Sequence, residues 1–324
     1  MPLRIIFCGT PEFAPPSLRY LLAQPDFQIA GVVTQPDRPS GRGHTTSSSP
    51  VKEAAVAARV PVYQPETIKS DEAREYFNRT APDAVVIIAY GQIIPQRLID
   101  IPRLGWINLH GSLLPKYRGA APIHRAIING ETRTGLTTMR IDAGLDTGPT
   151  LLKFETEIGP NETAPQLYAR LADAGAPLVA ETLRAIDRGA ISPMPQDNSQ
   201  ASFAPPLQKE EGRVVWTLPA RHIYNRIRGL QPWPGVFTSF RGKNCAIWGR
   251  PVSRVNASAG STSSAAGATH APGEILASGG NVSVACGEGS ALQLEFVQLA
   301  GRKRITALEF ANGARPTPGD RFGE

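Results

Sequence analysis

The chain has 324 residues, 41% of them hydrophobic, which allows about two domains with ordinary cores and excludes wholesale disorder. No apolar run approaches the roughly 20 residues of a membrane helix and no signal-peptide pattern opens the chain, so we expect a cytoplasmic protein without a membrane partner. Residues 1–204 hold 20 Lys and Arg against 20 Asp and Glu, whereas residues 205–324 hold 14 against 8, so the net charge of +6 lies in the last third. This asymmetry has two interpretations that charge alone supports about equally. The last third could be a basic domain that binds a polyanionic partner, or its basic surface could serve only solubility.

Strand-like and helix-like runs alternate along the first part of the chain. Buried strands are predicted at residues 4–8, 28–34, 61–63, 84–90 and 106–109, and helices at about 15–23, 50–59 and 71–79. Strands that alternate with helices indicate an α/β domain with a Rossmann-like, mainly parallel sheet. No G-x-G-x-x-G pattern follows the first strand, so a nicotinamide site is disfavoured. Cys8 lies in that strand as a core residue, and three cysteines without a C-x-x-C spacing fit a reducing compartment.

The remaining elements predict a second domain. A helix at 120–128, strands at 135–141 and 150–155 and a long helix at 163–188 complete the first domain. Beyond a polar, proline-rich segment, a helix at 220–230 precedes short strands whose spacing suggests a small barrel, at 236–240, 245–248, 274–277, 282–285 and 292–297. We therefore expect domains at 1–189 and 207–324 joined by a linker at 190–206. Residues 256–272 are rich in Ser, Ala, Gly and Thr and are expected to form a disordered surface loop.

The segment 105–115 (GWINLHGSLLP) carries the strongest chemical signal. Its apolar start forms a short strand, so Asn108 and His110 lie at the carboxyl end and project to the same face. A glycine-rich turn at 142–148 can bring the carboxylate of Asp146 back toward them. This set suits acyl or formyl transfer. Asn108 and His110 would stabilise an oxyanion, and Asp146 would set the protonation state of His110 or accept protons. A histidine at a strand end is also commonly structural, so spacing alone leaves both interpretations open.

Several longer motifs resemble those of a known family. Residues 108–115 (NLHGSLLP), 118–123 (RGAAPI) and 144–148 (GLDTG) are similar to the folate-dependent formyltransferases. Residues 7–14 (FCGTPEFA) and 34–39 (TQPDRP) resemble the branch that acts on initiator methionyl-tRNA. The similarity runs through nearly the whole chain, is densest before residue 150 and becomes loose after residue 250.

The resemblance implies a reaction and a set of site residues. The formyl donor would be 10-formyltetrahydrofolate, the acceptor the α-amino group of initiator methionyl-tRNA, and the second domain an OB-like barrel that binds tRNA. No metal is implied, and we expect a monomer. The implied catalytic residues are Asn108, His110 and Asp146. The implied folate-binding residues are Ser112, Leu113, Leu114, Pro115, Tyr90, Gly91 and Ile93. The implied tRNA-binding residues are Arg42, Lys209, Arg213, Arg302 and Lys303.

One loop departs from the family pattern. Where the family has basic residues followed by Pro-Ser-Pro, residues 44–49 read HTTSSS, which predicts fewer phosphate contacts from this loop.

Other functions remain open at this stage. Another formyltransferase, acting on a glycinamide ribonucleotide or a sugar nucleotide, would share the Asn, His and Asp set but lack the basic barrel. A one-carbon hydrolase is a third option, whereas a dehydrogenase would need a further nicotinamide domain. A non-catalytic RNA-binding protein on a decayed scaffold is a fourth, and the presence of all three polar residues argues against it.

Overall fold

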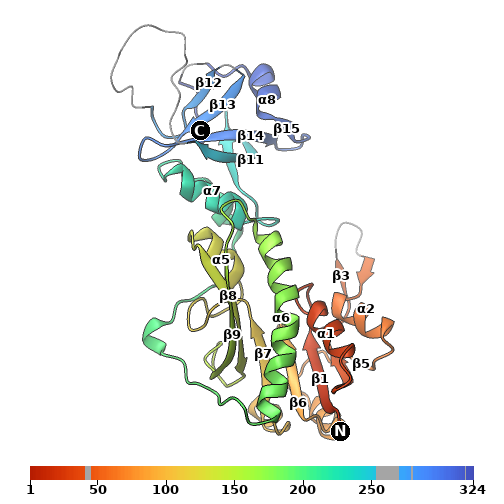
Figure 1. Ribbon diagram of the computed structural model, residues 1–324. Helices are drawn as coiled ribbons and strands as arrows, with labels where there is room; N and C mark the ends of the chain where they lie inside the picture. Colours follow the sequence, from red (N-terminus) through yellow and green to blue (C-terminus); the bar gives the residue numbers. More distant parts are fainter. Residues whose placement is uncertain (41–44, 253–269, 279, 318) are drawn as a thin grey trace. The chain divides into compact units, whose positions relative to one another are not determined.

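The chain forms two compact units. We analysed a computed structural model that describes residues 1–40, 45–252, 270–278, 280–317 and 319–324 (Figure 1). The N-terminal unit comprises Met1–Ile123, Arg133–Ile158 and Gln166–Pro205. The C-terminal unit comprises His124–Thr132, Gly159–Pro165 and Pro206–Glu324. The predicted boundaries at 189 and 207 stay a prediction. The prediction of a disordered loop at 256–272 falls mostly on residues 256–269, which lie outside the described residues.

A mainly parallel sheet forms the frame of the N-terminal unit, as the sequence predicts. Its described strands lie in the order β5-β2-β1-β6-β7-β8-β9. The first five of these pair in parallel, whereas β8 and β9 run antiparallel to their neighbours. Every residue of β6 and β7 is buried, as expected for central strands that are covered on both faces. The strands are β1 (Leu3–Gly9), β2 (Phe27–Val33), β5 (Val62–Tyr63), β6 (Ala84–Ile88), β7 (Trp106–His110), β8 (Arg133–Arg140) and β9 (Thr150–Glu157).

Helices cover this sheet, and the longest of them supports the strand that carries the central motif. The helices in this part of the chain are α1 (Pro15–Leu22), α2 (Pro50–Ala57), α3 (Asp71–Thr80), α4 (Gln96–Ile99), α5 (Pro122–Ile128) and α6 (Ala164–Asp187). From His124 on, α5 belongs to the C-terminal unit. Helix α6 lies along β7 and β8 (Figure 1). It approaches them closely because Gly175 has no side chain: a Cβ there would lie 2.5 Å from Leu109 Cδ2. The hydroxyls of Thr138 on β8 and Thr182 on α6 are hydrogen-bonded at 2.9 Å.

A short hairpin, β3 (Arg38–Ser40) and β4 (Thr45–Ser47), leads from β2 to α2. Sequence patterning did not predict it, because its strands have no apolar alternation. Helix α2 begins where Ser49 accepts a hydrogen bond from the backbone N–H of Lys52 (3.1 Å).

The C-terminal unit is an antiparallel barrel, in line with the predicted OB-like fold. Its described strands lie in the order β10-β11-β14-β13-β12, with β15 paired to β14. The last residues of the chain link the two outer strands through isolated antiparallel β-bridges. Phe322 pairs with Phe240 on β10, and Arg321 pairs with Glu274 beside β12. These elements are β10 (Phe237–Phe240), β11 (Lys243–Val252), β12 (Ile275–Ser278), β13 (Asn281–Ala285), β14 (Ala291–Leu299), β15 (Ile305–Thr306), α7 (Ala220–Gly229) and α8 (Ala307–Ala314).

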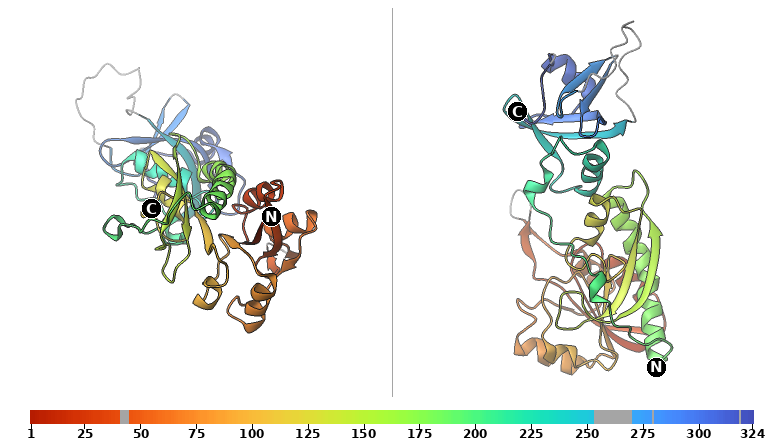
Figure 2. Two further views of the ribbon diagram at one scale, coloured as in Figure 1. Left: turned by 60° about the horizontal axis from the view of Figure 1, so that its bottom comes forward. Right: turned by 90° about the vertical axis from the view of Figure 1, so that its left-hand side faces the viewer.

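Helix α8 is not predicted from the sequence. It packs against the small sheet (blue helix in Figure 2, right), where Phe310 contacts the rings of Phe240 and Phe322. Its start carries a reciprocal cap, in which Thr306 accepts from the N–H of Glu309 and Glu309 accepts from the N–H of Thr306.

Two further expectations can be compared with the structure. The three cysteines are unpaired and buried, and Cys8 is a core residue of β1 as predicted. Among the described residues, no helix combines the length and the hydropathy that crossing a membrane requires.

Candidate active site

Strand β7 presents Asn108 and His110 side by side along one face. The strand is fixed by β6 and β8, with Asn108 opposite Ile87 and Met139. Asn108 is 9% exposed and His110 is 6% exposed. The amide of Asn108 has no hydrogen-bond partner within the part of the chain that the structure describes. The polar atoms of Asn108 are not among the fully buried unpartnered atoms of the described residues, so this amide stays open to a ligand.

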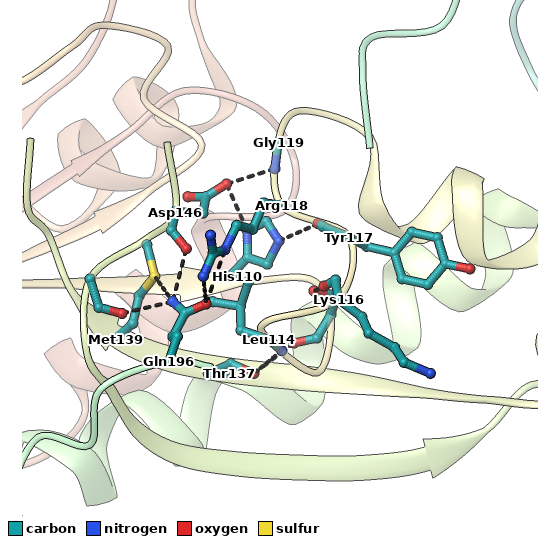
Figure 3. Close-up of polar contacts among 12 residues, drawn as sticks. His110, Leu114, Lys116, Tyr117, Arg118, Gly119, Thr137, Met139, Asp146 and Gln196 are labelled. Atoms are coloured by element: carbon teal, nitrogen blue, oxygen red, sulfur yellow. Dashed lines mark hydrogen bonds and ion pairs between the residues drawn. The ribbon is translucent and has the colours of Figure 1, made fainter. Parts of the chain in front are cut away.

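The two ring nitrogens of His110 face different partners (Figure 3). Nε2 lies 2.8 Å from the carbonyl oxygen of Tyr117, which can only accept, so Nε2 carries a hydrogen and donates it. Nδ1 lies 3.6 Å from Oδ2 of Asp146. Because Nε2 is bound to the main chain, Nδ1 is the nitrogen that remains to meet a substrate.

Asp146 reaches His110 only because its loop folds back. Strand β8 runs antiparallel to β7, so the loop after β8 begins beside Trp106, where Ile141 donates to the Trp106 carbonyl (2.9 Å). At its far end Asp146 has a positive φ of 51°, and its Oδ2 accepts from the N–H of Gly119 (2.8 Å). Asp tolerates this left-handed conformation better than most residues. The structure therefore brings the predicted His110 and Asp146 together.

The segment 194–204, which we name the strap, lies beside these loops. Sequence reasoning placed it in a linker, and its polar, proline-rich composition gives no signal for a role at the site. The structure nevertheless joins it to the loop whose Tyr117 carbonyl binds His110. Arg118 forms an isolated β-bridge with Phe203, and Ser202 accepts hydrogen bonds from the N–H groups of Tyr117 and Arg118.

The predicted folate-binding segment Ser112–Pro115 makes several contacts inside the protein. Thr137 Oγ1 donates to the Ser112 carbonyl (2.7 Å) and accepts from the Leu114 N–H (3.0 Å). The Leu114 carbonyl accepts from Lys153 Nζ at 2.6 Å. Ser112 and Leu114 are buried, whereas Leu113 and Pro115 are half-buried. These backbone groups already have partners, so a ligand here would meet Leu113 and Pro115 more readily.

The three other predicted folate-binding residues have different surroundings. Tyr90 is buried in the core, where burial raises the pKa of its phenol and keeps it neutral. Gly91 has a φ of 87° and is exposed, and Ile93 is 75% exposed. Gly91 also lines a pocket of about 650 Å³ together with Thr10, Gln35 and Gln92.

The pocket's neighbourhood includes the 34–39 motif. Asp37 is bound by Lys52 and by the side-chain amide of Gln64 (2.8 Å). These contacts hold the pKa of the Asp37 carboxyl below its ordinary value. Asp37 therefore fixes the loop rather than exchanging protons.

The predicted tRNA-binding residues can be placed except for Arg42, which lies outside the described residues. Lys209, Arg213, Arg302 and Lys303 are exposed on the C-terminal unit. Arg302 and Lys303 line a pocket of about 650 Å³ together with Lys243.

Sequence reasoning did not single out one further cation on this unit, Arg304. The guanidinium of Arg304 lies over the rings of Trp248 (5.3 Å) and Phe296 (4.9 Å) on neighbouring strands. By contrast, Arg226 and Arg228 of α7 bind main-chain carbonyls of the same unit, and Arg228 is buried. Arg226 and Arg228 therefore have structural partners.

Among the described residues, no group of three His, Cys, Asp or Glu side chains is arranged to hold a metal ion.

Comparisons with known proteins match both units. The model of the family described as formyl transferase matches residues 3–183, and that of the formyl transferase C-terminal domain matches residues 206–315. A methionyl-tRNA formyltransferase from Solibacter usitatus is 52% identical over 99% of this chain and 99% of its own. One from Koribacter versatilis is 48% identical over 98% of each chain. The crystal structure of WlaRD, a sugar 3N-formyl transferase solved in the presence of dTDP and 5-N-formyl-THF, shares the fold with a TM-score of 0.64 at 19% identity, covering 94% of this chain and 100% of that one.

Proposed function

Because the chain belongs to the formyl transferase family, we propose that it transfers a formyl group from 10-formyltetrahydrofolate to the α-amino group of methionine on initiator tRNA, for initiation of translation. The observation that carries this proposal is the similarity over both units to relatives named methionyl-tRNA formyltransferase, at 52% and 48% identity. We place the reaction in the cytoplasm, where charged tRNA is used, and propose that the enzyme acts as a monomer.

The proposed catalytic residues are Asn108, His110 and Asp146. The folate donor supplies a formyl group on nitrogen, and a neutral amine attacks its carbon. Asn108, whose amide has no partner within the described chain, and Nδ1–H of a protonated His110 would donate hydrogen bonds to the carbonyl oxygen as negative charge develops there. Because Nε2 already carries a hydrogen, a proton on Nδ1 makes the ring an imidazolium, and the Asp146 carboxylate beside Nδ1 would favour that form. Asp146 would also help to move protons from the amine to the leaving nitrogen. The main-chain carbonyl of Tyr117 supports this assignment, because it orients the ring through Nε2.

The donor site is proposed to lie along Ser112–Pro115, Tyr90, Gly91 and Ile93. Its fit is supported by apolar side chains that the protein leaves uncovered, since Ile93 is 75% exposed and Leu145, next to Asp146, is 62% exposed. A flat heterocycle would cover such groups and gain from their burial. Tyr90 would support the site from the core, because its side chain is 2% exposed.

For tRNA we propose a contact surface on the C-terminal unit formed by Lys209, Arg213, Arg302 and Lys303, with Arg42 added from the loop after β2. The excess of positive charge after residue 204 supports it, because phosphate contacts dominate the affinity of proteins for nucleic acids. These cations would position the tRNA without selecting its sequence.

The test is a formyl-transfer assay with labelled 10-formyltetrahydrofolate. Charged initiator tRNA should accept label rapidly, and elongator tRNA charged with methionine should accept little. A glycinamide ribonucleotide and an amino-sugar nucleotide serve as alternative acceptors. Label transferred to either of these, with none on initiator tRNA, would assign the enzyme to another branch of the family.

A further inference from the structure

The strap, residues 194–204, is built into the N-terminal unit by main-chain hydrogen bonds. Met194 exchanges two of them with Thr150 at the start of β9, both 2.8 Å long. Further along, Ser202 accepts from the N–H of Arg118 through its carbonyl (2.8 Å) and from the N–H of Tyr117 through its hydroxyl (2.9 Å). The strap thus lies across the two loops that contain the partners of His110.

Gln196, in the middle of the strap, uses its whole side-chain amide on these loops (Figure 3). Its Nε2 donates to the carbonyls of Asp146 (2.8 Å) and Gly148 (2.7 Å). Its Oε1 accepts from Nε (3.1 Å) and Nη2 (2.8 Å) of Arg118. Both donor hydrogens and both acceptor positions are therefore used, which fixes the orientation of the amide.

Arg118 carries this link to the second loop. Arg118 is 4% exposed, and its guanidinium also donates to Oδ1 of Asn198 (2.8 Å), which binds it to the strap at a second point. Its main chain follows Tyr117, whose carbonyl binds Nε2 of His110. One amide side chain therefore joins the loop that faces Nδ1 of His110 to the loop that faces Nε2.

Both loops need such support because each places a residue other than glycine in the left-handed region. Asp146 has a φ of 51° and Tyr117 a φ of 63°. Such conformations persist where surrounding contacts over-determine them. Here the Tyr117 carbonyl and the Asp146 carboxylate are the groups that orient the imidazole.

We propose that Gln196 is a positioning residue for formyl transfer. By binding the Asp146 loop and Arg118 together, it fixes the distance and direction of Asp146 relative to Nδ1 of His110. Within the described chain, it makes no hydrogen bond to Asn108 or His110, the predicted oxyanion donors. This inference rests on the proposed function, since it assigns a task to Gln196 in that same reaction.

The test compares Gln196→Met with Gln200→Met in the full-length enzyme. Both changes replace a glutamine of the strap, but Gln200 is exposed, and within the described chain its side chain binds Asp197, three residues earlier. We expect Gln196→Met to lower kcat by about tenfold to a hundredfold, the usual effect of misplacing a catalytic group by about 1 Å. KM for the folate donor and for tRNA should stay within about twofold, because Gln196 is not proposed to bind either substrate. Gln200→Met should behave as the wild type.

A spectroscopic readout separates positioning from general damage. The 15N chemical shifts of the His110 ring should change in Gln196→Met and stay the same in Gln200→Met. If Gln196→Met does not fold, Gln196→Glu replaces it: the carboxylate keeps the contact with Arg118 but turns an acceptor toward the two carbonyls, so kcat should fall as well.

Wild-type kcat in the folded Gln196 variant, or unchanged 15N chemical shifts of the His110 ring, would overturn the proposal. Wild-type activity in Asn108→Ala would instead reject the catalytic assignment itself, so the two failures can be told apart.

Discussion

At the scale of single residues, the site depends on which polar atoms already have partners. Both ring nitrogens of His110 face protein groups, whereas the equally buried amide of Asn108 is free within the described chain. The amide therefore has the greater freedom to donate to a substrate, and a bound substrate that excludes water would strengthen that hydrogen bond.

The first prediction concerns this amide. Asn108→Ala should lower kcat about 100–1000-fold, the usual cost of removing one oxyanion donor. Binding of the folate donor, measured by fluorescence titration, should change little. Asn78→Ala, on the exposed face of α3, is the matched control. Retention of most of the activity by Asn108→Ala would remove Asn108 from the mechanism.

The second prediction concerns pH. Arg125 binds both carboxylate oxygens of Glu211, and these hydrogen bonds hold the pKa of Glu211 below its ordinary value. A carboxyl with a lowered folded-state pKa stabilises the fold above its unfolded pKa of about 4.3. This contribution is lost as the pH falls through the lower, folded-state pKa.

Glu211→Gln should therefore lower the free energy of unfolding at pH 7 by about 1.5–3 kcal/mol, the usual value for hydrogen bonds to charged groups. The difference from wild type should shrink toward zero in acid below the folded-state pKa of Glu211. Denaturant titrations at a series of pH values measure it. Glu210→Gln, at the exposed neighbouring position, should show no such difference. A difference in unfolding free energy between wild type and Glu211→Gln that stayed constant with pH would contradict the lowered pKa of Glu211.

At the scale of elements, α6 and β7 form one packed structure. The helix can lie close to the strand because Gly175 leaves room for the side chain of Leu109, which stands between Asn108 and His110 in the sequence. The packing of this helix therefore helps to place the strand that carries the site.

The third prediction uses two helical glycines. Gly175→Ala puts a methyl group 2.5 Å from Leu109 Cδ2, and this overpacking, at about 1–3 kcal/mol, outweighs the gain of up to about 1 kcal/mol in helix propensity. The variant should be less stable. Gly313→Ala in α8 meets nothing within 4 Å, so it should be more stable by about 0.5–1 kcal/mol. Thermal unfolding of the two variants should give shifts of opposite sign.

At the scale of the whole molecule, charge and chemistry are divided between sequence regions. The chain is neutral up to residue 204, and its excess of positive charge follows. The N-terminal unit holds the candidate catalytic residues, and the C-terminal unit displays exposed cations around a barrel. This division allows affinity for tRNA to be changed separately from the rate of transfer.

The fourth prediction tests that separation. The double variant Arg302→Gln, Lys303→Gln should raise KM for tRNA and reduce the slope of log affinity against log salt by about 0.7–0.9 for each phosphate that these side chains no longer neutralise. Its kcat at saturating tRNA should be unchanged. The control, Lys69→Gln with Arg74→Gln, removes two exposed cations from the N-terminal unit. Equal salt slopes in the variant and the control would exclude Arg302 and Lys303 from the tRNA-binding surface.

The sequence by itself determined the order and type of most elements, the mainly parallel sheet, and the pairing of Asn108 with His110 on one strand. These follow from local periodicity, because apolar alternation and strand geometry act over a few residues. It also identified the family, because several motifs occur in the right order. It did not predict α8 or the hairpin of β3 and β4, whose short segments have weak patterns.

Only the tertiary structure decided how Asp146 meets His110. The loop of Asp146 begins beside Trp106, at the amino end of β7 and away from His110, and then folds back. The main-chain carbonyl of Tyr117 fixes the His110 ring from the other side. Gln196 joins these loops from a segment about 50 residues further along that has no apolar pattern. Contacts between side chains and main-chain carbonyls carry no sequence signature, because any residue can supply a carbonyl.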